Sequence, residues 1–308
     1  YIENIFGGTY MINAESVKAK LKNQAPKRGH MLQEELTTYG LERTIYRISI
    51  SDYVDNFTLK GGILLYALFD GNFTRATTDI DLLAQKTSNE VENIKGIFKE
   101  IFFIEVDDAL HYDLDSFDVH SITEFRTYHG VNVSIVAYLD RTKIPISIDI
   151  GFGDIVYPER VLMDFPVLLE MEVPKIYAYS LNSIIAEKFE AIVSLGYANS
   201  RYKDFYDIYV LASNYDFDGD ELKKAIEETF HHRQTGFDDI VAFEKGFAED
   251  VIRKSRWNSF IKKKKAMESV DFGTAVDMIK KFLQPIVEKI VDNVETNIQW
   301  KLQKKGWK

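Results

Sequence analysis

The chain has 308 residues, of which 45% are hydrophobic and 28% are charged, a composition typical of a globular protein with an ample core. The absence of cysteine excludes disulfides and thiolate metal sites, and no apolar run approaches the roughly 20 residues that span a bilayer. The formal net charge of −10 argues against a general nucleic-acid coat protein. We therefore expect a cytoplasmic protein without a membrane segment.

Residues 1–10 precede Met11, and we expect them to be a cloning remnant or the remainder of a longer start. In the first half of the chain, periodicity and turn residues predict helices over 14–22 and 31–49, a strand over 56–60, a helix over 63–69, a strand over 79–84, a helix near 88–102, and strands over 129–139 and 143–154. The last two strands are joined by a short polar turn, which is typical of a β-hairpin.

From residue 181 onward every strong period is helical. Helices are expected over 181–195, 203–214, 219–230, 238–256 and 271–293. The predicted fold class is therefore α/β (α+β), a core with a mixed sheet followed by a C-terminal helical domain. We expect the core, with its N-terminal helices, to cover 11–175 and the helical domain to cover 176–308.

The stretch "TTDIDLLA" (77–84) places Asp79 and Asp81 at alternate positions of an apolar strand. Aspartate is depleted from strands, and burying two carboxylates side by side is costly. In "KIPISIDIGFGD" (143–154) the alternation likewise puts Asp149 on the polar face, opposite four isoleucines. Three carboxylates on strand faces are typical of a site for Mg²⁺, with two ions expected. The alternative for the first pair alone is an edge strand with one face in water.

Gly61 and Gly62 lie between a predicted strand and the start of a predicted helix. Bare amides at such a position can approach the oxygens of a triphosphate. A tight strand–helix turn without a ligand is the alternative.

Taken together, these motifs resemble the nucleotidyltransferase (DNA polymerase β-like) superfamily. That superfamily usually carries Gly-Ser before the helix, so Gly-Gly is a departure, and it resembles the branch of the AbiEii/AbiGii toxins of abortive-infection and type IV toxin–antitoxin systems. The resemblance rests on "VKAKLKNQAPKRG", "FTLKGGILL", "RATTDIDLLA", "SIDIGFGD", "SLNSIIAEKFEAIV" and "RYKDFYDIYVL". It implies a nucleotidyltransferase core with an appended helical domain.

The resemblance also implies roles for individual residues. Asp79, Asp81 and Asp149 would be catalytic and bind the metal ions. Lys60, Gly61, Gly62, Arg75 and Thr77 would bind the nucleotide. Lys188 and Asp204 would be catalytic residues of the helical part, with Asp207 as the alternative acid. Without the resemblance, Lys188 would be a lysine whose stem lies along apolar surface, and the two acids would belong to a surface ion-pair ladder.

The function implied is a Mg²⁺-dependent toxin that transfers a nucleoside monophosphate from an NTP to RNA, most plausibly tRNA, and blocks bacterial growth. Its antitoxin would be encoded separately, and direct binding between the two is not required. The basic segment "VIRKSRWNSFIKKKK" (251–265) could hold RNA or be a solvated face. Two alternatives stay open: a small-molecule nucleotidyltransferase of the aminoglycoside-modifying kind, which the acidic segment 105–118 favours, and a degenerate NTP-binding protein.

Overall fold

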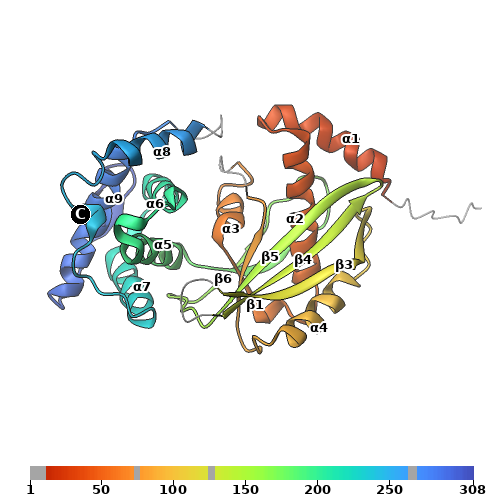
Figure 1. Ribbon diagram of the computed structural model, residues 1–308, viewed down its shortest axis with the longest axis horizontal. Coiled ribbons are helices and arrows are strands. Elements are labelled where there is room, and N and C mark those ends of the chain that lie inside the picture. Colours follow the sequence, from red (N-terminus) through yellow and green to blue (C-terminus); the bar gives the residue numbers. More distant parts are fainter. Residues whose placement is uncertain (1–11, 73–76, 124–128, 263–268) are drawn as a thin grey trace, which may run out of the picture. The chain divides into compact units, whose positions relative to one another are not determined.

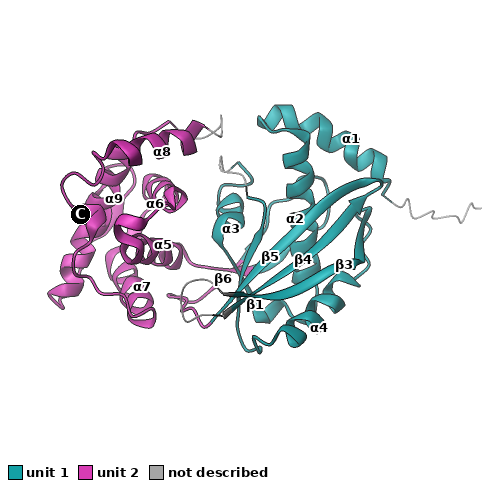
Figure 2. Ribbon diagram, in the orientation of Figure 1, with its two compact units in different colours: residues 1–152, 163–176 teal, residues 153–162, 177–308 magenta. Residues whose placement is uncertain are grey.

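The computed structural model describes residues 12–72, 77–123, 129–262 and 269–308, and the chain divides into two compact units (Figure 2). Unit 1 takes in the chain up to residue 152 together with 163–176, and unit 2 takes in 153–162 and everything from 177 onward. No helix among the described residues combines the length and the hydropathy needed to cross a membrane.

The framework of unit 1 is a seven-stranded sheet with strand order β3-β4-β5-β2-β1-β7-β6 (Figure 1). Its strands are β1 Phe57–Lys60, β2 Ile80–Ala84, β3 Leu110–Thr123, β4 His129–Leu139, β5 Thr142–Phe152, β6 Val161–Asp164 and β7 Lys175–Ala178. Strand β2 pairs parallel with β5 and antiparallel with β1, while β4 pairs antiparallel with both β3 and β5. The sheet is therefore mixed, as predicted.

Strand β5 shows why one face of the sheet is core and the other is polar. Its isoleucines at positions 144, 146, 148 and 150 are at most 1% exposed, whereas Ser147 and Asp149 on the other face are half-buried. Strand β4 repeats the pattern, with Val131 and Val133 buried and Asn132 between them half-buried. Side chains alternate along a strand, so this spacing directs every second residue to the core.

The described residues of unit 1 form helices α1 Ala14–Gln24, α2 Leu32–Ser49, α3 Gly61–Leu68 and α4 Val91–Phe102, with 3₁₀ turns at Ala25–Arg28 and Val54–Asn56. Helix α2 packs against β5, and α4 packs against β3 and β4 (Figure 1). Gly40 permits the close approach of α2, because a Cβ there would lie 2.6 Å from Ile144 Cγ2 and 2.8 Å from Ile146 Cδ1. The apolar face of the sheet is thereby covered.

Helix α2 also carries buried charges. Arg47 is paired with Asp108, at 2.6 Å from its Oδ2 and 3.2 Å from its Oδ1, and both side chains are almost fully buried. Glu42 accepts a 2.7 Å hydrogen bond from the backbone N–H of Leu168. Burial raises the pKa of the Glu42 carboxyl from 4.5 to about 7, against the opposing effects of that hydrogen bond and of neighbouring Arg43.

Unit 2 is mainly helical. Its helices are α5 Leu181–Leu195, α6 Tyr202–Asn214, α7 Gly219–His232, α8 Val251–Lys262 and α9 Phe272–Val291, with 3₁₀ turns at Gly196–Ala198 and Val241–Phe243. A small antiparallel sheet joins β8 Phe217–Asp218, β9 Gln299–Lys301 and β10 Gly306–Trp307, in the order β10-β9-β8. Trp300 anchors this sheet, since it is fully buried and donates from Nε1 to the carbonyl of Ala212.

The fold class is confirmed, but one predicted helix is wrong. The structure has no continuous helix over 238–256. Gly246, with φ +98°, is in a conformation that only glycine adopts readily, and Asp250 then caps α8 by accepting from the backbone N–H of Arg253. The structure also contains strand β3, which the sequence analysis did not predict. Residues 114–117 interrupt the pairing of β3 with β4, so the alternation of apolar and polar residues along this strand is broken.

We predict that Glu42→Gln removes a pH dependence of stability. The folded-state pKa of Glu42 lies above its ordinary value, so its contribution is fully present below about pH 4.5 and is lost as the pH rises through about 7. The stability of Glu42→Gln relative to wild type should therefore increase by about 3 kcal/mol between pH 4 and 8. Urea unfolding across that range measures it, with Glu92→Gln on the exposed surface of α4 as the control. Parallel pH profiles for wild type and Glu42→Gln would contradict the prediction.

Candidate functional site

Three carboxylates meet on the polar face of unit 1. Parallel pairing of β2 with β5 makes Asp81 and Asp149 direct neighbours, and Asp79 lies immediately before β2 on the same face as Asp81. One ligand oxygen from each of the three residues lies within 4.8 Å of the other two. The structure therefore brings together the three aspartates that the sequence singles out.

Each carboxylate is held by other groups of the chain. Thr77 donates from Oγ1 to Asp79 Oδ1 at 3.2 Å, and the backbone N–H of Gly62 donates to Asp81 Oδ2 at 3.3 Å. Asn132 donates from Nδ2 to Asp149 Oδ1 at 2.7 Å. These hydrogen bonds stabilise the ionised carboxylates, which offsets part of the repulsion between three negative groups.

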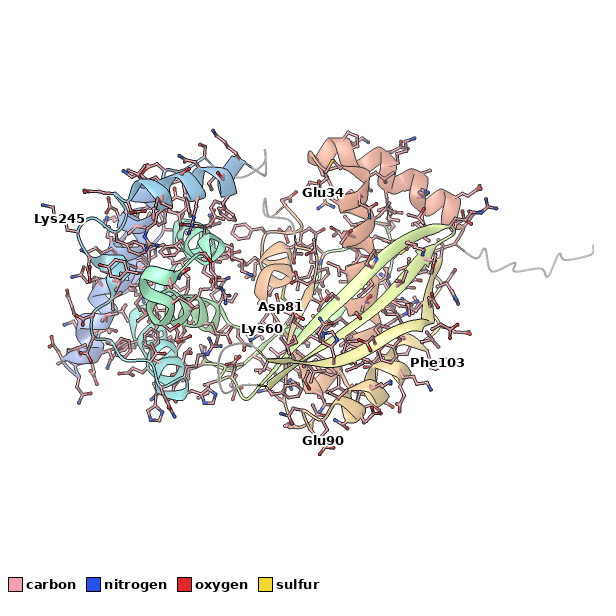
Figure 3. The ribbon with its side chains drawn as sticks, in the orientation of Figure 1. Glu34, Lys60, Asp81, Glu90, Phe103 and Lys245 are labelled. Carbon is pink, nitrogen blue, oxygen red and sulfur yellow. The ribbon has the colours of Figure 1, made fainter. Side chains whose placement is uncertain are left out.

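The Gly61-Gly62 pair shapes the site at the start of α3. Gly61 has φ +67°, and a Cβ on it would overlap the Asp81 carboxylate. Lys60 is the cross-strand partner of Asp81, and Figure 3 shows the two residues close together where β1 leads into α3. Glycine at 61 is therefore required for Asp81 to occupy its position. Nucleotide binding by Lys60, Gly61, Gly62 and Thr77 stays a prediction, and Arg75 lies outside the described residues.

The donor set fits a hard divalent cation. It consists of carboxylate oxygens alone, which are the ligands that Mg²⁺ and Mn²⁺ prefer, and it contains no imidazole or thiolate that would favour softer metals. Among residues 12–72, 77–123, 129–262 and 269–308, this is the one group of three His, Asp or Glu side chains with metal-site spacing. Mg²⁺ usually completes its coordination with water and substrate phosphates, for which three carboxylates leave room.

A second polar cluster lies within unit 2, between α5 and α6. Lys188 Nζ is 2.7 Å from Asp207 Oδ2 and 3.3 Å from Asp204 Oδ1, and Arg201 Nε is 2.7 Å from Asp204 Oδ2. Both aspartates are fully buried, so Asp204 and Asp207 do not belong to a surface ion-pair ladder. Lys188 contacts both acids.

The glutamates beside Lys188 have different partners. Glu187 and Glu190 are paired with Arg233 at 3.1 and 3.0 Å, and Arg233 also contacts Asp154 at 2.9 Å. Burial lowers the pKa of the Arg233 guanidinium, but the three carboxylates outweigh that effect and raise it. Arg233 therefore stays charged and ties the end of α7 to α5.

Asn132 is the residue of this site that the sequence analysis missed. A signal was present, because the β4–β5 hairpin turns at Asp140 and Arg141, so that Leu139 pairs with Thr142. Counting back along both strands from that pair puts Asn132 opposite Asp149. The hairpin register thus determines that Asn132, within "HGVNVSIVAYL", contacts Asp149.

Comparisons with known proteins identify the family. The sequence matches the family model described as "Nucleotidyl transferase AbiEii toxin, Type IV TA system" over residues 43–293. The fold is similar to JHP933 from Helicobacter pylori, at 16% identity and a TM-score of 0.47 over 82% of this chain and 92% of that one. It is also similar to a candidate nucleotidyltransferase from H. pylori, at 15% identity and a TM-score of 0.46 over 89% of this chain and 99% of that one. No curated protein sequence matches this chain.

We predict that Gly61→Ala disrupts the carboxylate site. The new methyl group must displace the Asp81 side chain, so the variant should lose most of its divalent-cation affinity, measured by Mn²⁺ titration. Gly29→Ala is the matched control, because Gly29 has a similar φ of +72° but no atom within 4 Å of a Cβ. It should cost roughly 1 kcal/mol of stability through backbone strain alone and leave Mn²⁺ affinity unchanged. Equal Mn²⁺ affinities for the two variants would contradict the role given to Gly61.

Proposed function

Because the chain belongs to the AbiEii nucleotidyl transferase toxin family of type IV toxin–antitoxin systems, we propose that it transfers a nucleoside monophosphate from an NTP to RNA, with tRNA as the acceptor. The observation that carries the proposal is the cluster of Asp79, Asp81 and Asp149 beside the Gly61 turn. The protein would act in the cytoplasm and block bacterial growth. A separately encoded antitoxin would counter it, without a requirement for direct binding.

In the proposed reaction, an acceptor hydroxyl oxygen attacks the α-phosphorus of the NTP. A bond forms between that oxygen and phosphorus, the bond from phosphorus to the bridging oxygen breaks, and pyrophosphate leaves. The hydroxyl proton passes to a base. The chain's contribution is to orient the triphosphate, which is the main requirement of phosphoryl-transfer chemistry. Lys60, Thr77 and the amides of Gly61 and Gly62 are proposed for that task, with Arg75.

Asp79, Asp81 and Asp149 are the residues that would hold Mg²⁺, with two ions expected. The chemistry that Mg²⁺ supplies at such a site is charge stabilisation of the transferring phosphoryl group and of the departing pyrophosphate. The hydrogen bonds from Thr77, Gly62 and Asn132 support this assignment, because they orient the carboxylates before any ligand is present.

Lys188 and Asp204 are proposed as further catalytic residues of unit 2, on the family resemblance. The Lys188 ammonium would supply positive charge to a phosphate oxygen, and Asp204 would act as a base or orient the nucleotide. Asp207 is the alternative acid, since it is as deeply buried and closer to Lys188. Their buried ion pairs supply fixed positions, which a charged group needs in order to act on substrate without reorganising.

The RNA acceptor is supported by exposed cations on α8. Lys254, Arg256 and Lys262 are exposed on this helix, and its described part contains no acidic residue. Exposed cations of this kind bind phosphates. Trp257 of this helix is fully buried and donates from Nε1 to the carbonyl of Val270, so it cannot stack on a base.

A small cationic acceptor is the second candidate, and it is favoured by the acidic residues of β3. Asp115 and Asp118 are exposed on that strand, and β3 is joined through β4 to β5, which carries Asp149. Asp108, from the same acidic segment, is buried against Arg47 and takes no part. Labelling assays with both kinds of acceptor separate the two candidates.

We predict that Asp81→Asn lowers nucleotide transfer by roughly 100-fold or more, because it removes the charge of a metal ligand with little change of shape. The assay incubates the protein with Mg²⁺, each labelled NTP in turn, and either purified tRNA or an aminoglycoside. Glu92→Gln, which changes an exposed acid of α4, should label as wild type does. Label in tRNA supports the proposal, and label only in the aminoglycoside supports the second candidate. Near wild-type labelling by Asp81→Asn would show that Asp81 is structural.

We predict that converting Lys262, Lys263, Lys264 and Lys265 together to Gln weakens tRNA binding and flattens its salt dependence. The last three of these residues lie outside the described ranges. The slope of log affinity against log salt should fall by about one for each phosphate that the variant no longer neutralises. Lys223→Gln with Lys224→Gln, on α7 of the same unit, is the control and should keep the wild-type slope. An unchanged slope in the four-lysine variant would assign the run to a solvated face.

A further inference from the structure

The β4–β5 hairpin brings one side chain of β4 onto the carboxylate cluster. Asn132 and Asp149 are cross-strand partners, in the same antiparallel register that pairs Leu139 with Thr142 next to the turn. Directly opposed residues of an antiparallel pair share a face and have Cβ atoms about 5 Å apart, so their side chains meet. The register of this hairpin therefore determines that the neighbour of Asp149 on β4 is an asparagine.

The Asn132 amide is fixed by two contacts. Nδ2 donates to Asp149 Oδ1 at 2.7 Å and to Ser147 Oγ at 2.9 Å, which uses both hydrogens of the NH₂ group. The reversed amide would turn its oxygen toward a carboxylate that can only accept, so this orientation is the favourable one. With Oδ1 held, the Asp149 carboxylate cannot rotate about its Cβ–Cγ bond without losing a charge-assisted hydrogen bond.

We infer that Asn132 is a positioning residue, which holds the Asp149 carboxylate in the orientation needed for the divalent-cation site. This inference rests on the proposed function, because it assigns Asp149 to the metal ligands. Partners of metal ligands outside the coordination sphere set ligand orientation, and their loss typically weakens metal affinity 10- to 100-fold. Asn132 touches Asp149 and would not touch the cation itself.

Two of the three carboxylates depend on a distant segment: Asp81 accepts from the Gly62 amide, 19 positions away, and Asp149 accepts from Asn132. The partners of Asp79, Thr77 and the Thr78 amide, are its immediate neighbours in the chain. Asp149 instead depends on a residue 17 positions away across the hairpin. Packing of the buried faces of β4 and β5 therefore controls the orientation of the third carboxylate through Asn132.

The test measures Mn²⁺ binding to the full-length protein, by titration followed with electron paramagnetic resonance, so that no catalytic activity is needed. Mn²⁺ is the probe because it accepts the same oxygen ligands as Mg²⁺. Asn132→Leu removes both donated hydrogen bonds with little change of volume, and the Mn²⁺ dissociation constant should rise about 10-fold. Ser134→Ala, on the same face of β4 two residues away, should bind as wild type does. The thermal midpoint of each variant shows whether it is folded.

A second pair of variants separates positioning from general damage. If Asn132 acts through Asp149, Asn132→Leu should cause no further loss of Mn²⁺ affinity in an Asp149→Asn background, because that background lacks the carboxylate to be oriented. Where Asp149→Asn binds too weakly to measure, the comparison of Asn132→Leu with Ser134→Ala decides. Wild-type affinity in folded Asn132→Leu would overturn the inference and leave the proposed function standing. Failure of the wild-type protein to bind Mn²⁺, with or without a non-hydrolysable NTP analogue, would overturn both.

Discussion

The parallel pairing of β2 with β5 is the constraint on which the site depends. It sets Asp81 beside Asp149, and the alternation of side chains adds Asp79 to the same face. Three carboxylates at this distance repel one another, so the fold must supply compensation for the unliganded protein. That compensation comes from three directions: Thr77 before the strand, the Gly62 amide at the start of α3, and Asn132 across the hairpin.

Rigidity behind the site comes from the opposite face of the sheet. The isoleucines of β5 are buried against α2, whose close approach depends on the missing side chain of Gly40. A one-residue shift of β5 would bring these isoleucines to the polar face and Asp149 into the core, so the apolar packing fixes the register. The pair of Arg47 with Asp108 ties α2 to the segment that precedes β3. The position of Asp149 is thus set by packing interactions on the face away from it.

Helix α5 shows how adjacent charged residues are assigned to separate tasks. Glu187 and Glu190 are three residues apart, share one side of the helix and bind Arg233, whereas Lys188 turns toward α6 and contacts Asp204 and Asp207. Unit 2 therefore holds one ion cluster that ties α5 to α7 and another that ties α5 to α6. Only the second contains residues for which the family resemblance implies catalysis.

Elements with a local residue pattern could be predicted from the sequence. The alternation in "TTDIDLLA" and "KIPISIDIGFGD" placed three aspartates on polar strand faces, and the apolar spacing after residue 181 placed most of the C-terminal helices. Periodicity failed at β3, where a bulge breaks the alternation, and over 238–256, where Gly246 and the Asp250 cap divide the segment. The small sheet of β8, β9 and β10 could not be predicted, because strands of two or three residues carry no period.

Tertiary structure alone decided which polar groups meet. Periodicity assigns a residue to a face, but it does not say which strand lies alongside. Only the pairing of β2 with β5 made neighbours of Asp81 and Asp149, which are 68 positions apart, and only helix packing made Asp204 and Asp207 buried partners of Lys188. The contact of Asn132 with Asp149 is an intermediate case between local patterns and long-range packing. A hairpin with a two-residue turn has a register that can be counted from the sequence once the turn is located. Contacts across longer separations depend on the packing of the whole core, which no local pattern encodes.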